Sequence, residues 1–232
     1  MNTDDRILRG LERLKRKELF DAQIAEIDRR DAFDATFGVE TSRPVEPWEI
    51  AEATDQTLSS NARYHPTPVG TVRAVIAAAK ARHEEMSFVD YGCGKGRVML
   101  VASDFPFRKI IGVEFARSLA DVARQNVQRY RAPTQRCHVL EVCCQDAVEF
   151  AIPDDAGFFY FYEPFSKATA ERVLANIESS LERHPRRAIL ALVGKALHPV
   201  VEQRPFWKVP GEPVASPDHE AYDARLYTST DG

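Results

Sequence analysis

The sequence lacks any long apolar run, and this absence bears on membranes. No stretch approaches the roughly 20 consecutive apolar residues that a membrane-spanning helix requires. The chain is charged from Asp4 onward, without the apolar core of a signal peptide. We therefore expect a cytoplasmic protein with no membrane partner.

Cysteine is scarce, and its few copies form no pattern. The 4 cysteines include no C-x-x-C pair, and the adjacent Cys143 and Cys144 suit no simple disulfide framework. We expect reduced thiols, as in cytosolic proteins. The histidines, His65 among them, lack the spacing of metal ligands, so they are interpreted as structural and no metal site is expected.

Basic residues are not in excess. The 31 Lys and Arg are outnumbered by 35 Asp and Glu, which gives a formal net charge of −4. A general nucleic-acid binder is usually basic, so nucleic acid is not the expected partner. With 232 residues, 44% of them hydrophobic and 28% charged, the chain can form one large soluble domain.

The most informative feature present is a glycine-rich turn within Phe88–Arg97. A short apolar strand carries Asp90 near its end, and Gly92, Gly94 and Gly96 follow at alternate positions before a helix begins. Such a turn lets the backbone approach a bulky ligand at a helix N-terminus, although a tight strand-to-helix corner is the alternative. The spacing G-x-G-x-G differs from the dinucleotide fingerprint G-x-G-x-x-G and from the phosphate loop.

A second apolar strand, Lys109–Glu114, ends in an acid, and helical periodicity follows over 115–130. An acid at the tip of the second strand of a βαβ unit can accept both hydroxyls of a ribose. An ordinary polar strand end is the alternative for Glu114. Its position after the glycine turn favours the ligand interpretation.

Strands alternate with helices along most of the chain, which predicts a doubly wound α/β fold whose mostly parallel sheet is buried on both faces. The expected strands are Ser87–Tyr91, Lys109–Glu114, His138–Cys143, Gly157–Tyr162 and Arg187–Val193. The expected helices are Val69–Arg82, Lys95–Ser103, Arg117–Tyr130 and Lys167–Arg183. Phe206–Val209 and Ala221–Tyr227 are candidates for a final antiparallel pair.

The N-terminal part predicts a separate helical extension. Apolar residues at helical spacing indicate a helix over Asp4–Arg30, and a shorter helix is expected over Trp48–Ser59. We divide the chain into an extension, residues 1–62, and a main domain, residues 63–232. The long helix is a candidate substrate clamp, lid or arm of a homodimer, and its pattern does not choose among them.

These motifs resemble the class I S-adenosylmethionine-dependent methyltransferases. The matching segments are VDYGCGKGR, IIGVE, the acid in CCQDAVEF, and FYFYEPF, within a resemblance that runs from about Tyr64 to Val193. The chain looks most like bacterial members with FGVET ahead of a GCGKGR loop. It is more loosely similar to seven-strand lysine methyltransferases, which place a Tyr-x-Pro-Thr segment before the first strand, here Tyr64–Thr67.

The resemblance implies a seven-stranded Rossmann-like sheet and S-adenosylmethionine as cofactor. Asp90 and the glycines of the turn would face the methionine part, and Glu114 would hold the ribose. Asp146 would accept the adenine amino group, and a helix N-cap over 147–150 is its alternative role. Tyr64 and Thr67 are candidates to cover the methionine end, or to pack an aromatic ring on the core.

Glu163 and Phe165 are the candidate catalytic residues. In amino-directed methyltransferases this position holds Asn or Asp, then Pro, then an aromatic residue. Here Glu163 is longer by one methylene, so it is open whether its carboxylate acts as a base, accepts a hydrogen bond or caps the next helix. The ring of Phe165 would cover the methyl path and favour the developing cation.

The sequence therefore predicts methyl transfer from S-adenosylmethionine to a nitrogen on a protein or a small molecule. A cofactor-binding partner subunit without catalysis is one alternative. An NAD(P)-dependent oxidoreductase is another, and the glycine spacing and the Glu-Pro-Phe segment speak against it.

Overall fold

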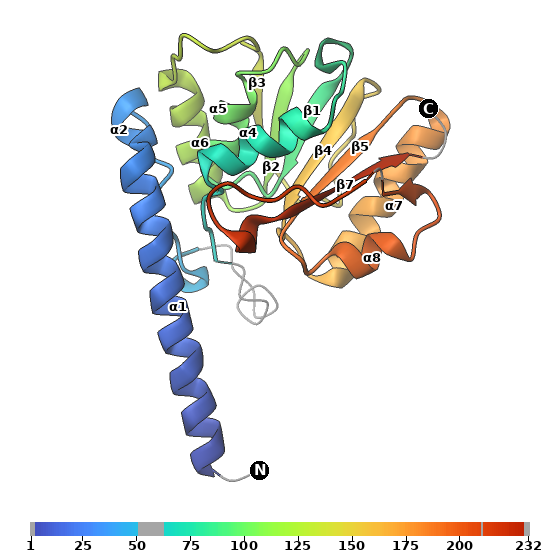
Figure 1. Ribbon diagram of the computed structural model, residues 1–232. Coiled ribbons are helices and arrows are strands. Elements are labelled where there is room, and N and C mark those ends of the chain that lie inside the picture. The colour runs from blue at the N-terminus through green and yellow to red at the C-terminus, as the bar shows by residue number, and fades with distance from the viewer. Residues whose placement is uncertain (1–2, 51–62, 210, 230–232) are drawn as a thin grey trace.

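A computed structural model describes residues 3–50, 63–209 and 211–229 of the chain. Its centre is a seven-stranded sheet in the order β3-β2-β1-β4-β5-β7-β6 (Figure 1). The first five strands pair in parallel, and β7 joins antiparallel to β5 and β6. The strands are β1 (Ser87–Tyr91), β2 (Ile110–Glu114), β3 (Leu140–Cys144), β4 (Ala156–Tyr162), β5 (Ile189–Val193), β6 (Trp207–Lys208) and β7 (Ala224–Ser229). The predicted fold class and the final antiparallel pair are confirmed.

Helices cover both faces of the sheet. One face packs against α4 and α5, and the other packs against α7 and α8, with alternate strand residues entering the two clusters. The helices after the N-terminal segment are α4 (Val69–Ala78), α5 (Arg97–Ala102), α6 (Arg117–Arg129), α7 (Lys167–Arg183) and α8 (His198–Glu202). Short 3₁₀ turns occupy η1 (Pro47–Glu49), η2 (His83–Glu85) and η3 (Glu220–Tyr222).

The prediction that every strand is buried on both faces is wrong for β3. Residues of β1, β2 and β5 are buried throughout, whereas β3 is partly exposed along its whole length. The reason is its place at the edge of the sheet, where a single neighbour, β2, covers it. Its sequence, LEVCC, was apolar enough to look central.

The N-terminal segment joins the main core. Helix α1 (Thr3–Asp31) is followed by the short α2 (Phe33–Phe37). Ile24, Ile27 and Phe33 belong to the same hydrophobic cluster as Phe88 of β1. The first half of α1 extends beyond the domain (Figure 1). The predicted boundary at residue 62 adjoins 51–62, outside the described residues.

The predicted helix over Trp48–Ser59 has only its beginning among the described residues, where η1 forms a 3₁₀ turn. Within the described part of the chain, no helix is both long and apolar enough to span a bilayer.

Candidate functional site

The glycine turn links β1 to α5 with all its glycines in the left-handed region. The φ angles of Gly92, Gly94 and Gly96 are 73°, 52° and 85°. The turn is also crowded by the protein's own side chains. A Cβ on Gly94 would lie 2.2 Å from the Tyr64 ring, and a Cβ on Gly92 would lie 2.5 Å from Cβ of Pro164. Glycine is required here by both backbone conformation and space.

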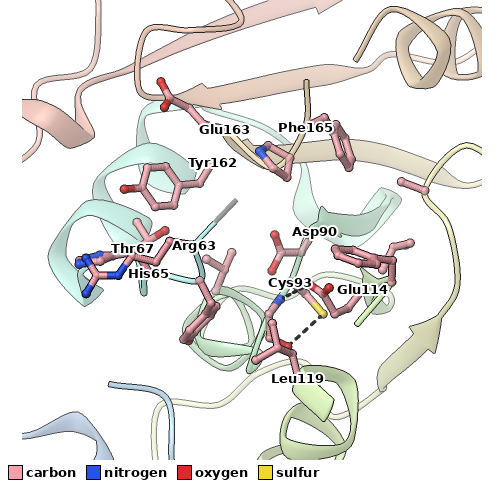
Figure 2. A pocket seen from close by; sticks show the side chains of 18 of the residues that line it. Arg63, His65, Thr67, Asp90, Cys93, Glu114, Leu119, Tyr162, Glu163 and Phe165 are labelled. Carbon is pink, nitrogen blue, oxygen red and sulfur yellow. Dashed lines mark hydrogen bonds between the residues drawn. The ribbon is translucent and has the colours of Figure 1, made fainter. Parts of the chain in front are cut away.

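Glu114, at the end of β2, holds the turn from the neighbouring strand. Its Oε2 accepts a hydrogen bond from the Gly94 N–H at 2.9 Å (Figure 2). Its Oε1 accepts one from the Ala116 N–H at 2.9 Å. The side chain is buried. The carboxylate thus fixes both the glycine turn and the start of α6, and it lines the adjacent cavity.

Asp90 lies next to it, one strand over. The side chain is 3% exposed, and its Oδ2 has no hydrogen-bond partner among the described residues. Burial raises the pKa of Asp90 well above its ordinary value, and the nearby Glu114 carboxylate adds to the rise. A buried carboxylate oxygen without a donor is costly, so it marks a place where a ligand can supply one.

A cavity of about 430 Å³ collects these groups at the carboxyl ends of the strands. This is the edge where open α/β sheets bind ligands, and the volume lies in the usual range for small-molecule sites. The cavity is lined by every predicted site residue except Gly96, which lies at the start of α5 against Ala123: Tyr64, Thr67, Asp90, Gly92, Gly94, Glu114, Asp146, Glu163 and Phe165.

Asp146 follows β3 and is exposed. Its Oδ1 accepts a hydrogen bond from the Val148 N–H at 2.8 Å, which stabilises a turn rather than a helix over 147–150. Asp146 therefore caps a turn, and the helix predicted over 147–150 does not form. The other carboxylate oxygen is free of that bond, so the turn and a contact to a ligand are compatible.

Glu163 has an unexpected conformation. Its φ is 42°, a left-handed value that is uncommon outside glycine. Its Oε1 accepts hydrogen bonds from the backbone N–H groups of Lys195 at 2.7 Å and Ala196 at 2.9 Å. Figure 2 shows the carboxylate pointing away from Asp90, toward this loop after β5. Glu163 does not cap the following helix, because Ser166 is the N-cap of α7 and its hydroxyl accepts a hydrogen bond from the Thr169 N–H.

Phe165 packs edge-on against two rings of the sheet. Its centroid lies 5.7 Å from that of Phe161 and 6.2 Å from that of Tyr91. The ring is partly exposed and lines the cavity. It is thus held rigidly at the end of β4.

Tyr64 packs its ring on the main domain, which is one of its two predicted roles, and covering the methionine end of the cofactor stays a prediction. Its ring lies over Gly94, and its hydroxyl donates to the Thr41 carbonyl at 2.8 Å. The ammonium of Lys95 lies 5.5 Å from the ring centroid. Thr67 is buried and lines the cavity a few residues further on.

The segment around FGVET is bound to the glycine turn through the buried side chains of Lys95 and Asn126. Lys95 forms an ion pair with Glu40, and its Nζ donates to the Arg43 carbonyl at 3.1 Å. The amide of Asn126 on α6 donates to the carbonyls of both Lys95 and Glu40 at 2.9 Å. The N-terminal segment is therefore part of the wall that supports the cavity.

The sequence analysis missed Arg63, His65 and Tyr162, which line the cavity on the β4 side of Asp90. The signal was present for two of them, since His65 stands in the Tyr-x-Pro-Thr segment and Tyr162 directly precedes Glu163. No group of three or more metal-binding side chains gathers anywhere in the described residues.

Comparison with known proteins gives two kinds of match. A stretch of 67 residues is 34% identical to a protein-lysine N-methyltransferase of Saccharolobus islandicus, covering 28% of this chain. The match spans only 41% of that curated relative's length. No family model matches the sequence.

Two solved structures share the fold. A glycopeptide N-methyltransferase, MtfA, complexed with S-adenosylmethionine, superposes with a TM-score of 0.52 and 15% identity, over 69% of this chain and 86% of that chain. An RNA methyltransferase from Salinibacter ruber, in complex with S-adenosylhomocysteine, superposes with a TM-score of 0.51 and 19% identity, over 71% of this chain and 93% of that chain. The chain therefore has the Rossmann-like fold that these methyltransferases share.

Proposed function

We propose that this protein is a methyltransferase that uses S-adenosylmethionine and methylates a nitrogen on a protein or a small molecule. The observation that carries the proposal is the placement of Asp90 and Glu114. They stand at the carboxyl ends of adjacent strands, on either side of a glycine turn, in one cavity. That arrangement suits a ligand with an ammonium group at one end and a ribose beside it.

The residues present fit this cofactor. The unpartnered Oδ2 of Asp90 can accept a hydrogen bond from the cofactor's amino group, and the Glu114 carboxylate lines the cavity where the ribose hydroxyls would lie. Asp146 and Ala147 would border the adenine. The cofactor supplies a methyl group already activated on a sulfonium. The protein then has to hold the methyl donor and the acceptor in line and exclude water, and this positioning can provide most of the rate acceleration.

The choice of a nitrogen acceptor rests on the relatives and on charge. The curated relative is named as a lysine methyltransferase and one structural relative as an N-methyltransferase. The other structural relative acts on RNA. The net charge of −4 favours a protein or small-molecule acceptor over a polyanion.

The test is the chemical nature of the methylated product. The pure protein is incubated with methyl-tritiated S-adenosylmethionine and an extract from a strain that lacks it. We expect label in the protein or small-molecule fraction that survives alkali, as an N-methyl group does. Label lost in mild alkali would indicate a carboxyl acceptor, and label released by ribonuclease would indicate RNA. Cofactor binding without label in any fraction would favour the non-catalytic partner subunit.

A further inference from the structure

The cavity continues past the cofactor residues toward β4. In the sheet order, β1 with Asp90 lies between β2, which carries Glu114, and β4, which carries Tyr162. Figure 2 shows Tyr162, Thr67, His65 and Arg63 together on the far side of Asp90 from Glu114. If the nucleoside lies toward Glu114, this β4 side is where the methyl acceptor must enter.

The β4 side contains a cluster of aromatic and polar side chains. The rings of Tyr162 and Tyr222 are in contact, with their centroids 5.2 Å apart. The Tyr222 hydroxyl also lies 3.0 Å from Nδ1 of His65. Phe20 of α1 packs on this group, with centroids 5.4 Å from His65 and 6.1 Å from Tyr222. The Tyr162 ring thus packs against Tyr222, which is in turn bonded to His65.

The charges on this side disfavour an anionic acceptor. Arg63 is already bound by two carboxylates, Asp21 at 2.6 Å and Glu46 at 2.8 Å. Burial, together with Arg63, lowers the pKa of His65 to about 4, so the imidazole is neutral at physiological pH. Carboxylates therefore outnumber free cations, and the nearest ligand-facing groups are neutral hydroxyls and an aromatic ring.

Glu163, at the position expected to contact an amine, has one carboxylate oxygen bonded to the protein's own backbone. Oε1 of Glu163 is taken by the Lys195 and Ala196 N–H groups and faces away from Asp90. The preceding residue, Tyr162, has both a ring and a hydroxyl at the cavity wall.

Resting on the proposed function, we propose that the acceptor is a primary amine of the lysine type and that the Tyr162 hydroxyl accepts a hydrogen bond from its N–H. Tyr222 and His65 are positioning residues: Tyr222 packs against the Tyr162 ring, and His65 is bonded to the Tyr222 hydroxyl, so together they hold the ring in place. The amine enters neutral. Its lone pair forms the new N–C bond as the C–S bond of the sulfonium breaks, and that electron pair stays on sulfur. The methylated nitrogen becomes cationic beside the Tyr162 ring and then loses a proton to solvent.

The chain offers a matched control. Tyr227 and His198 form a second tyrosine–histidine pair, with the hydroxyl 2.9 Å from Nδ1, and neither residue lines the cavity. Tyr227→Phe therefore removes a buried hydroxyl of the same kind from a place that the proposal does not involve.

The test uses the full-length protein with S-adenosylhomocysteine bound and two peptides. Acetyl-Ala-Gly-Lys-Gly-Ala-amide carries the amine, and its norleucine counterpart has the same length without it. Both are titrated at about pH 10.4, where about half of the lysine is neutral. We expect the lysine peptide to bind about fivefold more tightly, as one hydrogen bond allows. Tyr162→Phe should bring this ratio close to one, whereas Tyr227→Phe should leave it unchanged.

The positioning residues are tested by the same ratio. Tyr222→Phe and His65→Leu should lower it, and His65→Asn, which keeps a polar atom near the Nδ1 position, should restore part of it. Affinity for S-adenosylhomocysteine should be the same in all variants. A wild-type protein that does not bind S-adenosylhomocysteine would contradict the proposed function itself. Binding of S-adenosylhomocysteine with no preference for lysine, or with a preference that survives Tyr162→Phe, would overturn only the amine site.

Discussion

The guanidinium of Arg97, at the end of the glycine turn, forms an ion pair with the carboxylate of Asp28 on α1. Arg97 is 2% exposed, and it also donates to the hydroxyls of Thr41 at 2.7 Å and Ser42 at 2.6 Å. The Arg97 side chain thus connects the glycine turn, the segment containing FGVET and the N-terminal helix. The N-terminal helix, whose role the sequence left open among a substrate clamp, a lid and a dimer arm, is thus attached to the glycine turn.

Breaking this pair should destabilise the fold. Burial raises the pKa of Asp28, despite the opposing effect of Arg97, so the intact pair is not itself a large net gain. Asp28→Ala leaves the buried guanidinium with only the more distant Asp34 carboxylate, 3.7 Å away, which should lower the free energy of unfolding by about 3 kcal/mol. Denaturant titration measures this change in the free energy of unfolding. The control is Glu26→Ala, which breaks an exposed pair with Arg29 and should change stability by less than about 0.5 kcal/mol. Equal effects would show Asp28 to be dispensable.

Gly94→Ala should abolish cofactor binding. The new Cβ meets the Tyr64 ring at 2.2 Å, in addition to the strain of a φ of 52°. Gly38→Ala is the matched control, because Gly38 has a φ of 65° but nothing within 4 Å of its Cβ. Gly38→Ala should cost only about 1 kcal/mol of stability and leave cofactor affinity unchanged. Calorimetry on both variants separates the two effects, and full affinity in Gly94→Ala would refute the packing of Tyr64 on the turn.

Glu163→Gln should retain most of the methyl-transfer rate. A glutamine oxygen can still accept from the Lys195 and Ala196 N–H groups, so the loop stays in place. Glu163→Ala should lower the rate, because both N–H groups lose their acceptor. The rate of tritium incorporation into the identified acceptor is the measurement, with the exposed Glu171→Ala as control. A drop of roughly a hundredfold or more in Glu163→Gln would instead identify Glu163 as a base.

Lowering the pH from about 6.5 to 4 should reduce the stability of the fold because of His65. The folded state lowers the pKa of His65 to about 4, from 6.5 in the unfolded chain. As pH drops through this window, His65 becomes protonated in the unfolded state but stays neutral in the folded state. The free energy of unfolding therefore decreases by on the order of 3 kcal/mol. His65→Gln should flatten the profile in this range. The exposed His138→Gln should not, and identical profiles for His65→Gln and wild type would contradict the burial of a neutral imidazole.

Much of the sheet could be predicted from the sequence, because buried parallel strands are short apolar runs. Ser87–Tyr91 matches β1 to the residue, and the acid after the IIGV run is at the end of β2 as expected. The glycine spacing correctly indicated a turn with left-handed residues. These features depend on local pattern, which a single sequence contains.

Contacts between distant segments could not be predicted in this way. Arg97 binds Thr41, 56 residues earlier, and no periodicity links the two positions. The direction of Glu163 depends on where the loop after β5 presents its N–H groups. His65 and Tyr222, 157 residues apart, meet only because the C-terminal segment returns to the sheet beside α1.

The central claim, a cofactor held between Asp90 and Glu114, is tested most directly by calorimetry of the wild-type protein with S-adenosylmethionine and with NAD. We predict binding of S-adenosylmethionine in the micromolar range and no binding of NAD. Glu114→Ala should weaken binding by about 2–3 kcal/mol, whereas Glu141→Ala on the exposed edge strand should not change it. Tight NAD binding without S-adenosylmethionine binding, or equal affinity in Glu114→Ala and wild type, would contradict the account.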